Sequence, residues 1–156
     1  MESIPFYQVD AFTCGKFTGN PAGVCVITGW LPGDLMQKIA MENNLAETAF
    51  IVPEGKEWLI RWFTPVTEVD LCGHGTLASA FVVIDILEPE RQEVTFHTMN
   101  MGDLVVRKKT DMLELDFPTD KLHKCDLPQM VIESLGKEPV ECFAGRSDFL
   151  LLFGSE

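Results

Sequence analysis

The feature that most constrains the fold is an almost wholly apolar stretch over residues 77–87, which Ser79 and Asp85 alone interrupt. A helix that is apolar on every side must be buried on every side. The stretch is well short of the roughly 18 apolar residues that a membrane-spanning helix needs. We therefore predict a buried central helix over residues 75–87, with a sheet around it.

Runs of aromatic and β-branched residues, separated by turn signals, predict strands on both sides of this helix. Asp34 is placed to cap an earlier helix, over residues 35–43. The predicted strands cover residues 5–14, 22–28, 48–52, 58–64, 93–98, 104–108 and 112–117. This order predicts an α+β fold, in which a mainly antiparallel sheet curls around the buried helix.

The C-terminal part of the chain has too few elements for a domain of ordinary size. It predicts a linker, a helix over residues 127–135 that Asp126 caps, and two strands within residues 140–153. A helix and two strands rarely form a stable domain by themselves. We therefore expect one domain over residues 1–118, followed over residues 119–156 by a linker and the truncated start of a second domain.

The charge and the cysteines exclude several classes of function. The formal net charge is −12, so bulk electrostatics do not favour nucleic acid or an anionic membrane as a partner. The five cysteines are odd in number and include no C-x-x-C pair, which favours reduced thiols over a disulfide framework. The N-terminus shows no basic stretch followed by an apolar run, so we expect no signal peptide and a cytoplasmic protein.

Glu47 is the first candidate for chemistry. It lies where a predicted helix gives way to a strand, beside Leu45, Ala49 and Phe50. Apolar neighbours desolvate a carboxylate partly, which favours a group that can both take and give a proton near neutral pH. The alternative is a solvated loop glutamate, the commoner situation for this residue type.

The second candidate is His74, which Gly73 and Gly75 flank at the start of the buried helix. Free backbone N–H groups and the helix dipole together make such a position an anion site, suited to a carboxylate. Glycines also let a ligand approach the main chain closely. The alternative is a glycine-rich helix cap with no ligand.

Two further side chains have both a functional and a structural interpretation. Cys72 at a helix N-terminus could serve as a nucleophile or base, or could be a small buried core residue. Asn20, between Gly19 and Pro21, could orient a substrate or could simply form a turn. No recognised metal-ligand spacing is present, so no metal site is predicted.

Five segments, taken in order, resemble the N-terminal half of the phenazine-biosynthesis isomerase (PhzF-like) family. They are residues 7–13, 17–24, 44–50, 61–65 and 68–78. The resemblance implies a diaminopimelate-epimerase-like fold, in which two similar α+β halves each wrap a sheet around a helix. The active site of that family lies in the cleft between the halves, and this chain resembles the first half plus the start of the second.

The resemblance also implies roles for individual residues. Glu47 would be the general acid/base and His74 would assist it, while Gly73, Gly75 and Asn20 would bind the substrate. No cofactor is implied, because side chains alone transfer the proton on a small carboxylate substrate. In the family the second half supplies further catalytic residues, so activity of this chain by itself stays open, and phenazine biosynthesis does not follow from the resemblance.

Two alternatives remain open at this point. Residues 71–75 also resemble the proline racemase segment that carries a catalytic cysteine, which favours an amino-acid racemase or epimerase using Cys72. A third reading is a non-catalytic half-module. Its exposed apolar face would then favour a homodimer or pairing with a complementary subunit.

Overall fold

A computed structural model describes residues 3–16 and 18–155, and the chain divides into two compact units, Met1–Phe117 and Pro118–Glu156. The described part of the first unit contains an eight-stranded sheet with the order β1-β2-β3-β4-β6-β7-β8, and β5 pairs with β4. The strands are β1 (Phe6–Ala11), β2 (Asn20–Val26), β3 (Glu47–Glu54), β4 (Glu57–Phe63), β5 (Glu68–Val69), β6 (Glu93–His97), β7 (Asp103–Lys109) and β8 (Met112–Asp116). The helices are α1 (Gly33–Asn43), α2 (Gly73–Phe81) and a π-helix, η1 (Val82–Leu87).

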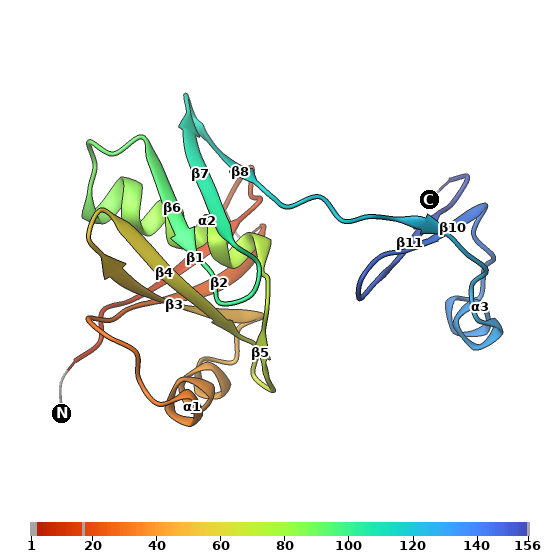
Figure 1. The fold of residues 1–156 in the computed structure, drawn as a ribbon, viewed down its shortest axis with the longest axis horizontal. Coiled ribbons are helices and arrows are strands. Elements are labelled where there is room, and N and C mark those ends of the chain that lie inside the picture. The colour runs from red at the N-terminus through yellow and green to blue at the C-terminus, as the bar shows by residue number, and fades with distance from the viewer. Residues whose placement is uncertain (1–2, 17, 156) are drawn as a thin grey trace. The chain divides into compact units, whose positions relative to one another are not determined.

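The predicted α+β class and curled sheet are confirmed. The sheet wraps around α2, as Figure 1 shows, and α1 packs on its outer face. Most neighbouring strands are antiparallel, but β2–β3 and β4–β6 are parallel. The side chains of β3 alternate between the two layers, so Ala49 and Ile51 pack in the core around α2 while Phe50 packs in the core under α1.

The central helix differs from the prediction in its start and its burial. It begins at Gly73 rather than at residue 75, and it widens into the π-helix from Val82. Phe81, Ile86 and Leu87 are 40%, 43% and 38% exposed, so the expectation of burial on every side is wrong for these three. The edge strands β1 and β8 are not paired with each other, so the described sheet does not enclose the helix completely.

Several predicted boundaries are also corrected, for local backbone reasons. β1 ends at Ala11 because Phe12 takes a positive φ of 57°, which breaks the extended conformation. β2 already begins at Asn20. Neither predicted aspartate caps its helix: α1 begins after Pro32, and in the second unit the helix begins after Pro128, with no side-chain cap in either case. Both prolines are the N-cap residues: their backbone is not yet helical, and their carbonyls accept the first hydrogen bonds of the helix.

The second unit has its own small sheet. Its strands are β9 (His123–Lys124), β10 (Glu141–Ala144) and β11 (Phe149–Leu152), in the order β11-β10-β9. β9 was not predicted. The helix α3 (Gln129–Leu135) ends at Gly136, whose φ of 67° provides the expected left-handed stop. Among the described residues, no helix is long and apolar enough to cross a membrane.

His97 stabilises a short junction of the large sheet. β4 and β6 pair only at Trp58–Phe96 and Leu59–His97. The Nδ1 atom of His97 lies 2.7 Å from Oδ1 of Asp103, and its Nε2 atom pairs with Glu57. The hydrogen bonds to Asp103 and then to Glu57 raise the pKa of His97, because only the doubly protonated ring can donate to both carboxylates.

We expect this junction to weaken as the pH rises. The folded pKa of His97 is raised above its ordinary value, so its contribution is complete below about pH 6.5 and is lost as the pH passes the folded pKa. His97→Gln should therefore lower the urea midpoint more at about pH 5 than at about pH 9. His123→Gln, an exposed histidine in β9, is the control. An equal effect of His97→Gln at both values would contradict the prediction.

Candidate active site

The start of β3 places Glu47 on the inner face of the sheet. Glu47 pairs in parallel register with Ala22 of β2, and its side chain shares the inward direction of Ala49. Its side chain is 21% exposed. Glu47 is therefore not a solvated loop residue. It is the first residue of a strand, and its side chain faces α2.

The start of α2 is organised by Cys72, which is its N-cap. Cys72 is extended, with φ of −146°, and its sulfur accepts a hydrogen bond from the Gly75 N–H at 3.4 Å. The hydroxyl of Thr76 donates to the Cys72 carbonyl at 2.6 Å. The first intrahelical bond joins Thr76 N–H to the same carbonyl, so the amides of Gly73 and His74 precede the helical ladder.

A carboxylate, an imidazole and a thiol meet at this helix start. The Nε2 atom of His74 lies 3.0 Å from Oε2 of Glu47, and its Nδ1 atom lies 3.5 Å from the sulfur of Cys72. His74 is 8% exposed. The two atoms are close enough for an ion pair, but the angles of the contact do not meet those of a hydrogen bond. Neither Oε2 of Glu47 nor Nε2 of His74 has a hydrogen-bond partner among the described residues. Buried polar atoms left unpaired are uncommon in folded proteins and mark a place where function is to be sought.

Burial keeps the Cys72 thiol protonated. Desolvation raises its pKa to about 12, Glu47 adds to this effect, and the hydrogen bond from the Gly75 amide opposes it. A protonated thiol can donate to Nδ1 of His74, and that leaves the ring proton on Nε2, opposite Glu47. The three groups therefore form one polar row, Cys72 to His74 to Glu47.

Gly75 lets α2 approach the sheet, and it lies against a residue that the sequence did not single out. A Cβ atom at position 75 would lie 3.0 Å from Cδ1 of Trp62 and 3.1 Å from the Cys72 sulfur. Trp62 is 1% exposed, and its Nε1–H has no hydrogen-bond partner among the described residues. A buried indole usually finds a partner. The signal that could have pointed to Trp62 is the tryptophan itself, which lies in the predicted strand 58–64, before Gly73 and Gly75.

The other two predicted binding residues lie near this region without joining the row. A Cβ atom at Gly73 would lie 2.9 Å from the ring of Phe117, an exposed side chain that can turn away. Asn20 is half-buried at the start of β2, and no described contact links it to Glu47 or His74. Gly19 before it has φ of 95°, a conformation that favours glycine.

The same three side chains are the described group that could hold a metal ion. One ligand atom each from Glu47, Cys72 and His74 lies within 4.8 Å of the others. Carboxylate, thiolate and imidazole are all donors that zinc accepts, and structural zinc takes four such ligands. The cluster offers three, and the burial that keeps Cys72 protonated opposes a thiolate ligand. We assign no metal here.

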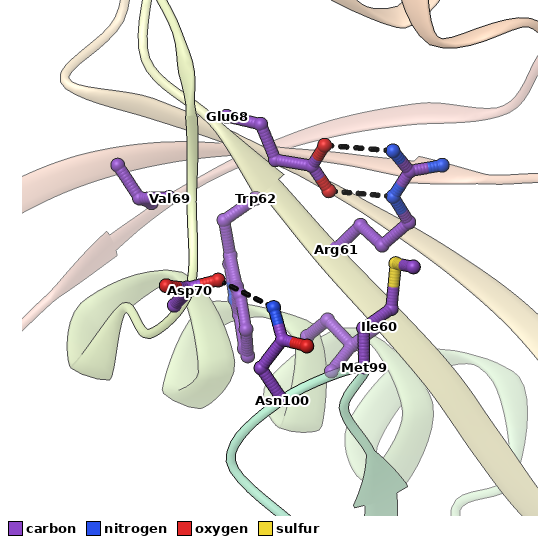
Figure 2. Close-up of a pocket in the computed structure, with 8 residues that line it drawn as sticks. All are labelled: Ile60, Arg61, Trp62, Glu68, Val69, Asp70, Met99 and Asn100. Carbon is purple, nitrogen blue, oxygen red and sulfur yellow. Dashed lines mark hydrogen bonds and ion pairs between the residues drawn. The ribbon is translucent and has the colours of Figure 1, made fainter.

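A separate pocket of about 210 Å³ is lined in part by Trp62 and does not include the polar row. Figure 2 shows its polar side chains already paired: Arg61 with both oxygens of Glu68, and Asn100 with Asp70. These pairs satisfy the charged and amide side chains of the pocket, although the N–H of Trp62, which also lines it, has no partner among the described residues. The start of α2 is therefore the candidate site.

Fold and site together define an α+β protein in which a buried helix start meets a strand carboxylate. The phenazine biosynthesis-like protein family (PhzC-PhzF) matches residues 9–141. An uncharacterized isomerase of Pseudomonas aeruginosa is 42% identical over 153 residues, which is 98% of this chain and 58% of that protein. A phenazine biosynthesis-like domain-containing protein of Mus musculus is 45% identical over 123 residues, which is 74% of this chain and 42% of that protein.

Solved structures agree with this result. A PhzF-family phenazine biosynthesis protein of Enterococcus faecalis superposes with a TM-score of 0.87 at 42% identity, over 99% of this chain and 59% of that one. A protein of P. aeruginosa described as a predicted epimerase shares the fold, with a TM-score of 0.69 at 21% identity. The chain belongs to the phenazine biosynthesis-like family, and it spans about 58% of the length of the first curated relatives it matches.

The close approach at Gly75 leads to a stability prediction. Gly75→Ala should destabilise the first unit, because overpacking against Trp62 and Cys72 costs about 1–3 kcal/mol. The higher helix propensity of alanine returns up to about 1 kcal/mol of this. Gly33→Ala, where a Cβ atom meets nothing nearer than 3.9 Å, is the matched control and should be neutral or stabilising. Urea denaturation measures both, and equal midpoints for the two variants would contradict the packing argument.

Proposed function

We propose that the protein is a PhzF-type, cofactor-independent isomerase that moves a proton on a small carboxylate substrate. The observation that carries the proposal is the contact of 3.0 Å between Glu47 and the almost buried His74, at the start of a helix. Family membership and the names of the relatives support the same reaction class.

Glu47 is the proton carrier in this proposal. Its carboxylate removes a proton from an activated carbon of the substrate, becomes neutral, and returns the proton at another position. One of its oxygens faces Nε2 of His74, so a ring proton on Nε2 would stabilise the ionised form before and after each turnover. Because the site is mostly buried, the carboxylate meets the substrate with little competing water.

The substrate carboxylate would bind at the amides that begin α2. Gly75 N–H already donates to the Cys72 sulfur, so the amides of Gly73 and His74 are the ones left to receive an anion. Gly75 would then act through packing rather than through its N–H. Asn20 would line the same inner face without touching the polar row.

The proposal places Cys72 behind His74 as a positioning residue. Its S–H donates to Nδ1 and so selects the imidazole tautomer that presents Nε2–H to Glu47. The racemase alternative needs a thiolate at Cys72, and burial raises the pKa of that thiol to about 12. This favours Glu47 over Cys72 as the proton carrier.

A complete cleft would require groups beyond those described in this chain. The chain covers about 58% of the relatives' length. The remaining groups would come from the rest of a longer polypeptide, or from a second copy or a complementary subunit that pairs with it. We also propose that the boundary between the two domains lies near residue 118, as the sequence predicts.

In a longer polypeptide or complex that completes the cleft, Glu47→Gln should almost abolish incorporation of solvent deuterium into a small carboxylate substrate. The amide keeps the shape but does not carry the proton, so the exchange rate should fall by about 10²–10⁴-fold. Proton NMR of the substrate in D₂O measures the exchange, with the wild-type protein as the reference. Glu54→Gln, at the exposed end of the same strand, is the control and should exchange normally. Undiminished exchange in Glu47→Gln would exclude this residue as the carrier.

Cys72→Ala should slow exchange by only about tenfold, because it removes one hydrogen bond to His74. Cys72→Ser restores a donor and should recover most of the rate. In wild type, ¹⁵N NMR of His74 should show the Nε2–H tautomer, and in Cys72→Ala a mixture. Loss of all exchange in both variants, with the tautomer unchanged, would instead indicate thiolate catalysis.

A further inference from the structure

Two cysteines of the second unit face each other at close range. The sulfurs of Cys125 and Cys142 lie 3.3 Å apart, and all five cysteines of the chain are free thiols. Cys125 is half-buried and Cys142 is 6% exposed. Neither residue belongs to the polar row of the first unit, so this pair needs its own explanation.

The backbone around the pair already has the geometry of a cross-strand disulfide. β9 and β10 pair antiparallel with Lys124 opposite Phe143, so the next position sets Cys125 opposite Cys142. The Cys125 N–H donates to the Cys142 carbonyl at 3.1 Å. Hydrogen-bonded neighbours of this kind have Cα atoms about 5.5 Å apart, inside the range of about 4.4–6.8 Å that disulfides span. Rotation of the two side chains therefore suffices to bring the sulfurs to bonding distance.

The other thiols do not offer this arrangement. Cys25 and Cys72 are buried, and no contact between either of them and another sulfur is described; burial raises the pKa values of both, and burial and then the neighbouring Cys125 also raise the pKa of Cys142, so the distinction lies in the sulfur contact. Cys14 is exposed, and no sulfur partner is described for it. Among the described residues, Cys125 and Cys142 are the cysteines whose sulfur atoms lie in contact.

We propose that Cys125 and Cys142 form a reversible oxidative modification site, closed by a disulfide between β9 and β10. With a small-molecule disulfide as oxidant, the Cys125 thiolate attacks one of its sulfurs and releases one thiol. The Cys142 thiolate then attacks the Cys125 sulfur and releases the second thiol. The two protein thiols lose two protons and two electrons, and the oxidant gains them. Cys125 reacts first because it is the more exposed of the two.

The disulfide would close the segment that contains α3. This helix has no buried residue, so packing holds it little within its unit. A covalent bond between the ends of the segment would restrict its freedom in both the folded and unfolded states. The site is independent of the isomerase proposal, because no residue of the polar row takes part.

Mass spectrometry after oxidation tests the site directly. Trypsin cuts after Lys124, Lys137 and Arg146, so the two cysteines fall in separate peptides, 125–137 and 138–146. After treatment with glutathione disulfide, the whole protein should lose about 2 Da, and the two peptides should appear linked. Reduction with dithiothreitol should reverse both changes.

Variants assign the order of the steps and provide the control. Cys14→Ser should form the same link as wild type. Cys142→Ser should stop at a mixed disulfide of glutathione on Cys125, and Cys125→Ser should show neither link nor adduct in the 138–146 peptide. The proposal is overturned if wild-type peptides 125–137 and 138–146 stay unlinked, or if Cys125 pairs with Cys14 instead. The wild-type result decides this even where a variant folds poorly.

Discussion

The close packing of the first turn of α2 against Trp62 is the contact on which the site depends. Gly75 has no side chain, so the helix approaches the indole more closely than any other residue would allow. That approach carries Cys72 and His74 to the inner face of β3, where Glu47 begins the strand. Helix packing of this kind is set by shape, so a methyl group at one position is enough to disturb the polar contacts beyond it.

The polar row lowers the stability of the folded protein, because some of its buried polar atoms are unpaired. Glu47 and His74 face each other at 3.0 Å without good hydrogen-bond angles, and the Trp62 N–H beside Gly75 is unpaired among the described residues. Buried polar groups normally find partners because each unpaired one costs free energy. A site that receives a polar substrate has a reason to keep such groups open. In the pocket of Figure 2 the charged and amide side chains pair with each other, and the unpaired N–H belongs to Trp62, which lines that pocket as well.

Much of the fold could be predicted from local patterns. Alternation of apolar residues predicted most strands of the first unit, and the apolar stretch after residue 76 predicted the central helix. The errors occurred where one backbone angle or a non-local contact decided the outcome. Phe12 ends β1 by its positive φ, prolines rather than aspartates begin α1 and α3, and the exposed face of η1 reflects a sheet whose edges do not meet.

The sequence by itself singled out Glu47 and the glycine-flanked His74 as candidates for proton chemistry, because they stand at recognisable element ends, and it left a structural alternative open for each. It also determined that the long apolar segment must lie in a core. Only the tertiary structure decided that Glu47 and His74 touch, that Cys72 stands behind the imidazole, and that Cys125 faces Cys142. The Glu47–His74 and Cys125–Cys142 contacts join separate segments of the chain, and helix packing and strand register fix them, which no local pattern encodes.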